Sequence, residues 1–203
     1  MKRRGLIPPT ERVVEIYREM LWYRRQLYND ADFFKVPEAW EKICEGNQTY
    51  KTKTYRSEIT EDFKRRAGIV VLGESATLIA DEKLIERARE GCKLSNFILA
   101  HEIGHLALDH HARNAKVKNF QLFEGANGLS NIPPTTEEWE ANFAAVSFQC
   151  GVALEDTKAT ALELAHRAYS DTKTIRMAQK LVQLDAFQRE LRRQSLRYER
   201  VVL

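Results

Sequence analysis

The sequence "LAHEIGHLALDHH", residues 99–111, combines four histidines and two acidic residues with apolar side chains. In an α-helix, residues four apart lie on one face, so His101 and His105 point in the same direction. Two imidazoles at this spacing can bind one divalent cation, and Glu102 can reach a water molecule on the open side of the metal. The stretch is typical of the HExxH zinc site. There, metal-activated water attacks a carbonyl carbon, and Glu102 acts as the general base.

The residues around this motif predict a largely buried helix. Ser95 or Asn96 is a suitable N-cap, and the pattern continues for four or five turns without a proline. Unpaired histidine and glutamate side chains are costly in such a helix, which favours a metal site over a chance match. The apolar residues of this helix are Phe97, Ile98, Leu99, Ile103, Leu106 and Leu108.

A catalytic zinc ion requires three protein ligands and one open position. His111 has the spacing of the third histidine in HExxHxxGxxH, but Leu108 stands where that pattern needs a helix-breaking glycine. In a continuous helix, His111 lies about 240° around the axis from His105 and faces away. We therefore expect His110 and His111 to extend from the exposed end of the motif helix.

A better candidate for the third ligand lies in "TTEEWEANFAA", residues 135–145. A helix over residues 137–150, capped by Thr135 or Thr136, places Glu138, Ala141, Asn142 and Ala145 on one face. Glu138 then completes a His, His, Glu site, and the two alanines allow the helices to approach closely. Asn142 can accept the ring N–H of a ligand histidine.

Glu140 is the alternative ligand. It lies about 200° from Glu138 around the same helix, so it replaces Glu138 if the helix begins later than expected.

The remaining sequence predicts an α+β protein that is mostly helical, with a small antiparallel sheet and a C-terminal helical extension from about Asp156. The strand Thr77–Ala80 is either an ordinary internal strand or an edge strand that pairs with an extended substrate beside the metal. The other predicted elements are a helix over residues 10–28 with Thr10 as N-cap, a short helix from Pro37 to Gly46 and Asn47, a strand Ile69–Leu72, a turn at residues 73–75, and a linking helix over residues 82–91.

Composition indicates a cytoplasmic protein without a nucleic-acid or membrane partner. The 203 residues include 32 basic and 29 acidic side chains, so the net charge is only +3. The three cysteines form no CxxC pair, and no stretch approaches the roughly 20 apolar residues of a membrane span. We interpret the arginines of the C-terminal helix as a solvated face balanced by acids, rather than a patch for an acidic partner. These are Arg189, Arg192, Arg193, Arg197 and Arg200.

The motif "HEIGH", a loop of about thirty residues and then "EWEANFAA" resemble the ImmA/IrrE family of zinc metallopeptidases over roughly residues 65–155. The resemblance implies a zincin-like domain, which we place at residues 1–155, with residues 156–203 as a helical extension packed on it. It also implies zinc ligands His101, His105 and Glu138, with Glu102 as general base.

The same resemblance implies an intracellular endopeptidase with a protein substrate, such as a helix-turn-helix repressor. The chain itself has no convincing helix-turn-helix, so any control of DNA requires a partner. One alternative is a metal-binding regulator that inactivates its partner by binding without proteolysis. Another is a zinc hydrolase for a small molecule, which a deep closed pocket would favour.

Overall fold

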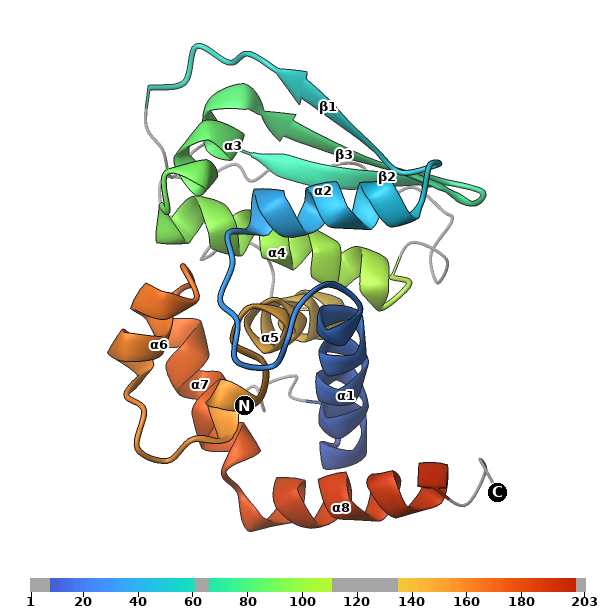
Figure 1. Cartoon of the computed structure of the whole chain (residues 1–203), viewed down its shortest axis with the longest axis vertical. Helices are drawn as coiled ribbons and strands as arrows, with labels where there is room; N and C mark the ends of the chain where they lie inside the picture. The colour runs from blue at the N-terminus through green and yellow to red at the C-terminus, as the bar shows by residue number, and fades with distance from the viewer. Residues whose placement is uncertain (1–7, 61–65, 111–134, 200–203) are drawn as a thin grey trace, which may run out of the picture.

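The computed structural model describes residues 8–60, 66–110 and 135–199, with side chains to residue 195. A three-stranded sheet with α2, α3 and α4 forms one end of the molecule, and α1 and α5 to α8 form the other (Figure 1). This confirms a mostly helical α+β architecture. The elements are α1 (Thr10–Leu27), α2 (Val36–Gly46), β1 (Lys51–Tyr55), β2 (Ala67–Leu72), β3 (Ser75–Asp81), α3 (Glu82–Arg89), α4 (Lys93–Ala107), α5 (Thr136–Cys150), the 3₁₀ helix η3 (Gly151–Glu155), α6 (Ala161–Arg167), α7 (Thr172–Val182) and α8 (Asp185–Glu199).

The sheet has the order β1-β3-β2 and is mixed, so the prediction of an antiparallel sheet is wrong. The predicted hairpin is present, because β2 and β3 pair antiparallel with Ile69 opposite Leu78. The additional strand β1 pairs parallel with β3. Its sequence, "KTKTY", is almost entirely exposed and lacks the apolar alternation of a half-buried strand.

The central position of β3 decides between the two interpretations of Thr77–Ala80. This strand has β1 on one side and β2 on the other, so it is internal, and the edge-strand interpretation is wrong. Among the described strands, β2 is the edge strand that contacts α4. The strand with a position beside the motif helix is therefore β2.

The motif helix begins earlier than predicted and has a different cap. It starts at Lys93 after the N-cap residue Cys92, whose side chain makes no capping hydrogen bond. Asn96 is instead buried: its side-chain oxygen accepts the backbone N–H of Val36 at 2.7 Å, and its amide donates to the carbonyl of Ala88 at 2.8 Å. Asn96 thus joins the start of α2 and the end of α3 to α4.

The C-terminal helices pack on the predicted metallopeptidase region. Helix α7 contacts α5, and α8 contacts α1 (Figure 1). Within the described chain, no helix has the length and apolar character needed to cross a membrane.

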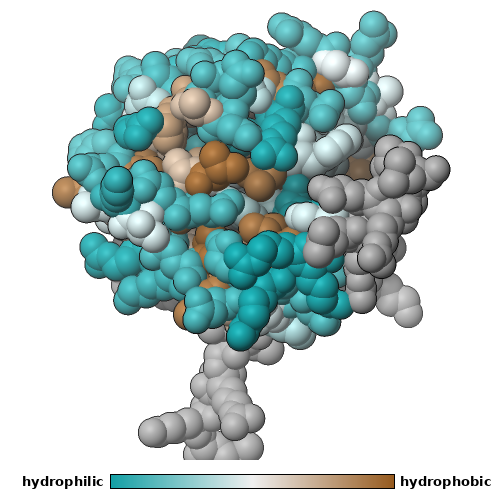
Figure 2. All heavy atoms as spheres, turned by 60° about the horizontal axis from the view of Figure 1, so that its bottom comes forward, coloured by the Kyte–Doolittle hydropathy of each residue, from teal (hydrophilic) through white to brown (hydrophobic). Residues whose placement is uncertain are grey.

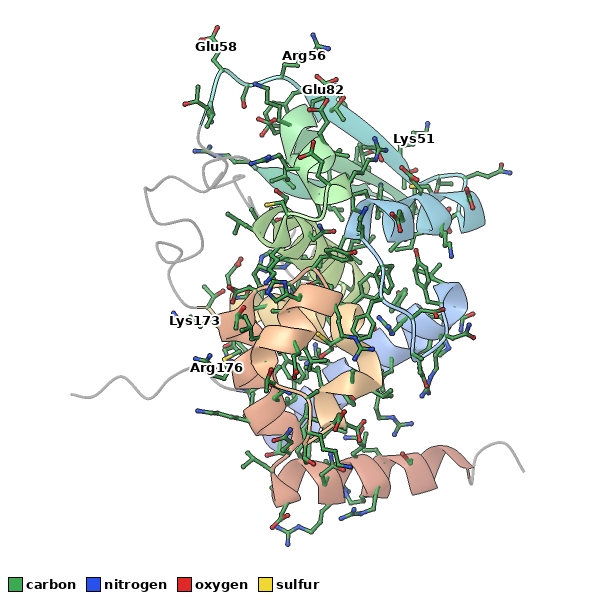
Figure 3. All side chains as sticks on the ribbon, turned by 60° about the vertical axis from the view of Figure 1, so that its left-hand side comes forward. Lys51, Arg56, Glu58, Glu82, Lys173 and Arg176 are labelled. Carbon is green, nitrogen blue, oxygen red and sulfur yellow. The ribbon has the colours of Figure 1, made fainter. Side chains whose placement is uncertain are left out.

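The surface carries charges of both signs. Figure 2 shows an apolar strip within a largely hydrophilic face. In Figure 3, Lys173 and Arg176 point outward from α7, while Arg56 and Glu82 form an ion pair at the sheet end. On α8, Arg193 pairs with Glu190 and with Glu11, as expected for a charge-balanced face.

The end of α5 is fixed by a buried arginine from α1. The guanidinium of Arg24 donates hydrogen bonds to the carbonyls of Phe148 and Gln149 at 2.8 and 3.0 Å. A positive charge suits this position because helix C-termini carry unsatisfied carbonyls and partial negative charge. The chain then turns at Gly151, which has a φ of +56°. A Cβ atom at this position would lie 2.6 Å from Arg24 Nε.

We expect Gly151→Ala to lower the free energy of unfolding by more than about 1 kcal/mol, because both the backbone angle and Arg24 oppose a side chain. Urea unfolding measures the effect. The control is Gly46→Ala at the end of α2, where a Cβ would meet no atom within 4 Å. If both variants unfold at the same urea concentration as the wild type, the described packing of Gly151 is wrong.

Candidate metal centre

The two helices of the predicted site approach each other closely at Gly104. A Cβ atom on Gly104 would lie 3.0 Å from the carbonyl oxygen of Ala141 and 3.1 Å from Ala144 Cβ. Of the two alanines predicted at this approach, Ala141 is among the nearest contacts of Gly104, whereas Ala144 takes the place predicted for Ala145. This short separation allows side chains from both helices to reach one point.

The structure brings His101, His105 and Glu138 together at this point. The Nε2 atoms of the two histidines are 3.0 Å apart. Glu138 Oε2 is 3.2 Å from His101 Nε2, and Glu138 Oε1 is 3.6 Å from His105 Nε2. Four tetrahedral ligands at zinc distances of about 2.0–2.1 Å lie about 3.3–3.4 Å from one another. The observed spacing therefore fits three ligands of one zinc ion.

The hydrogen bonds behind the histidines also fit a metal. Asn142 Oδ1 lies 3.0 Å from His101 Nδ1, as a bond from the ring N–H requires. With the proton on Nδ1, the lone pair of His101 Nε2 faces Glu138. A carboxylate and a bare imidazole nitrogen are both acceptors, so a proton or a cation must lie between them.

The pKa values of His101, His105 and Glu138 reflect two effects, burial of each group and the hydrogen bonds between them. Burial acts to raise the pKa of Glu138, but its hydrogen bonds to the histidines outweigh burial and lower it well below its usual range. Burial lowers the pKa of His105 to about 4. At His101 burial acts in the same direction, but the bond to Glu138 and nearby negative charges raise its pKa. A proton therefore competes with a cation at His101.

Glu102 lies next to this group and is also buried. Burial raises its pKa to about 7, and the negative charge of Glu138 adds to this effect. The charge of His101 and a backbone hydrogen bond at Ile69 oppose it. Ile69 is in β2, so the structure places the carboxyl group of Glu102 between the motif helix and the edge strand.

Glu140, the alternative ligand, points elsewhere. Its carboxylate accepts hydrogen bonds from Arg12 and lies 3.1 Å from His110 Nε2. It is 4% exposed and is not part of the His101, His105 and Glu138 group. The geometry thus brings Glu138, and not Glu140, to the two histidines.

The expectation that His110 extends into solvent is wrong, because its side chain is fully buried. The chain reverses at Asp109, whose φ is +51°, and the backbone N–H of His110 bonds to the carbonyl of His105 at 3.1 Å. With the bond from Asp109 N–H to Leu106 O, this is a Schellman motif. Aspartate tolerates this backbone region, which is a sequence signal for the turn. His111 lies outside the described residues.

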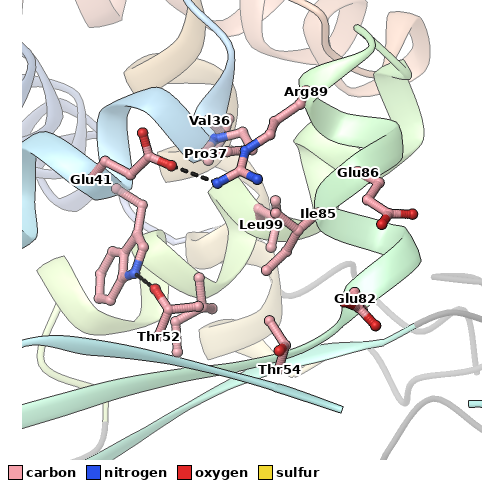
Figure 4. A pocket seen from close by; sticks show the side chains of 12 residues that line it. Val36, Pro37, Glu41, Thr52, Thr54, Glu82, Ile85, Glu86, Arg89 and Leu99 are labelled. Atoms are coloured by element: carbon pink, nitrogen blue, oxygen red, sulfur yellow. Dashed lines mark hydrogen bonds and ion pairs between the residues drawn. The ribbon is translucent and has the colours of Figure 1, made fainter. Parts of the chain in front are cut away.

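A cavity of about 230 Å³ lies between α2, α3, α4 and the sheet (Figure 4). Its lining includes Trp40, Ile85 and Leu99, together with Glu41 and Arg89, which form an ion pair. None of the residues that line it belongs to the candidate metal site. This cavity therefore gives no support to a small-molecule hydrolase.

Comparisons with protein-family models, with curated proteins and with solved structures return no match. The resemblance to the ImmA/IrrE family therefore depends on the two sequence motifs alone.

We expect the metal-free protein to bind one zinc ion per chain and to gain stability from it. At free zinc of 100 times Kd, the gain is about 2.7 kcal/mol, measured by thermal unfolding. The gain is smaller at acidic pH than at neutral pH, because protons compete for the histidines, above all His101.

Loss of a residue that only hydrogen-bonds to a metal ligand typically weakens metal binding 10–100-fold. Because Glu138 is a proposed ligand itself, Glu138→Gln should weaken zinc binding by at least this factor. Competition with a chromophoric chelator measures the Kd. Glu137→Gln is the matched control, because Glu137 is on the same helical turn but outside the group. Equal Kd values for the two variants would remove Glu138 from the site.

Proposed function

We propose that the protein is a zinc-dependent endopeptidase in which His101, His105 and Glu138 bind the metal and Glu102 is the general base. The observation that carries this proposal is the buried carboxyl group of Glu102 beside three converging ligand atoms. When bound, zinc supplies a Lewis acid that polarises a carbonyl group and lowers the pKa of a water molecule.

Glu102 has the properties of a proton carrier. Its pKa of about 7 lies close to neutral pH, where a general base is most effective. Glu102 can therefore accept a proton from the attacking water and later donate one to the leaving amine.

The position of β2 favours an extended peptide as substrate. This edge strand contacts α4, and the backbone of Ile69 bonds to Glu102. A peptide that pairs with an edge strand gains backbone hydrogen bonds that do not depend on its sequence. We propose that the substrate lies along β2, with its scissile carbonyl group near Glu102.

The resemblance to the ImmA/IrrE family extends the proposal to an intracellular regulatory protein as substrate, with a helix-turn-helix repressor as the partner to test first. The alternative is a regulator that retains the metal but inactivates its partner by binding to it. One experimental result distinguishes such a regulator from an endopeptidase. The regulator inactivates its partner in stoichiometric amounts and produces no new fragments.

The test compares zinc-loaded wild-type protein with Glu102→Gln on a mixture of internally quenched fluorescent peptides. We expect Glu102→Gln to bind zinc with unchanged stoichiometry and to cleave about 10²–10⁴-fold more slowly, because it lacks only the proton acceptor. Glu86→Gln, an exposed change on α3, is the control and should cleave at the wild-type rate.

Two results would contradict the proposal. Cleavage by Glu102→Gln at the wild-type rate would exclude Glu102 as the base. A wild-type protein that binds zinc, cleaves no peptide and yet inactivates a repressor without fragments would establish the binding alternative instead.

A further inference from the structure

A chain of buried polar contacts leads from His105 to the first helix. His105 Nδ1 lies 2.8 Å from His110 Nδ1, and His110 Nε2 lies 3.1 Å from Glu140 Oε2. Arg12 donates from Nε to Glu140 Oε1 at 3.1 Å and from Nη2 to Glu140 Oε2 at 2.9 Å. The contacts connect α4, the turn after it, α5 and α1.

With both histidine rings neutral, the donor and acceptor properties of these groups assign the position of each proton. A carboxylate that receives two hydrogen bonds from a guanidinium group is an acceptor, so the proton in the next contact belongs to His110 Nε2. A neutral His110 then has a bare Nδ1, which can only accept. The proton between the two rings therefore belongs to His105 Nδ1.

This arrangement leaves the lone pair of His105 Nε2 directed at Glu138, 3.6 Å away. The opposite tautomer, with the proton on Nε2, could not bind a metal through that atom. Asn142 has the same effect on His101 through a direct contact of 3.0 Å between Asn142 Oδ1 and His101 Nδ1. The two ligand histidines thus have different supports, and the contacts from His105 through His110 and Glu140 reach Arg12 of α1.

We propose that His110, held by Glu140 and Arg12, is a positioning residue that keeps the proton of His105 on Nδ1 and so leaves Nε2 free to bind the metal. The metal-binding consequence rests on the proposed zinc centre, whereas the tautomer of His105 does not. His110 occupies this position because the turn at Asp109 directs it back toward His105.

Arg12 is needed because Glu140 is buried. A carboxylate that is 4% exposed requires a charge partner, and Arg12 provides two hydrogen bonds from a half-buried position. Loss of Arg12 leaves the charge of Glu140 uncompensated and loosens the support of His110. The effect of Arg12 on the metal is therefore indirect.

The test uses His110→Phe, which fills space but cannot accept a hydrogen bond, and His110→Gln, whose side-chain oxygen can. We expect the zinc Kd of His110→Phe to rise about 10–100-fold, as for other outer partners of metal ligands. His110→Gln should bind zinc more tightly than His110→Phe. A role in packing alone predicts no advantage for glutamine.

A second readout needs no metal. The chain has five histidines, so ¹⁵N NMR of histidine-labelled, metal-free protein can identify the tautomer of each ring. We expect the wild type to carry the His105 proton on Nδ1 and His110→Phe to populate the Nε2 tautomer. Arg12→Met should weaken zinc binding in the same direction. The matched control is Glu15→Gln, which removes the exposed partner of Arg12 and should leave the Kd unchanged.

A wild-type zinc Kd together with a wild-type His105 tautomer in His110→Phe would overturn the proposal. If His110→Phe does not fold, Arg12→Met decides, and a Kd equal to that of Glu15→Gln overturns it. Failure of the wild type to bind zinc would overturn the metal centre instead. In that case, a His105 tautomer that changes in His110→Phe still supports the positioning role.

Discussion

The approach of α4 to α5 at Gly104 is the constraint on which the rest of the site depends. The ligand atoms come from both helices, and their mutual distances of 3.0–3.6 Å require backbones that nearly touch. Any side chain at Gly104 would press on the backbone of Ala141. Other elements hold the two helices together, because α1 packs on α5 and β2 packs on α4.

In the metal-free protein, bringing several hydrogen-bond acceptors together in a buried site costs free energy. Two imidazole nitrogens and a carboxylate cannot satisfy one another without a proton or a cation. Protein elements around the site hold these groups in position before any ion arrives, since Asn142 and His110 contact the opposite edges of the two rings. Such preorganisation reduces the ordering that binding of an ion at the proposed site requires.

The sequence predicts those parts of the fold that a local pattern of residues determines. The motif helix, the helix of Glu138 and the hairpin follow from apolar periodicity, and Thr135 caps the helix of Glu138 as predicted. The predicted helix faces gave the group of His101, His105 and Glu138. The strand β1 was missed because its exposed side chains carry no such periodicity. Asn96 is predicted as a possible N-cap of the motif helix, but its side chain binds the backbone of Val36 instead, and long-range partners of this kind leave no local signal. His110 was misplaced because a helical wheel cannot describe a chain that reverses at Asp109.

The contact between Arg12 and Glu140 spans 128 residues of sequence. A fragment that begins after α1 would keep every proposed metal ligand but lose the cation that stabilises Glu140. The support of His105 is complete only when α1 is docked on α5. If the proposed centre binds zinc, its affinity therefore depends on the docking of a helix that contributes no ligand.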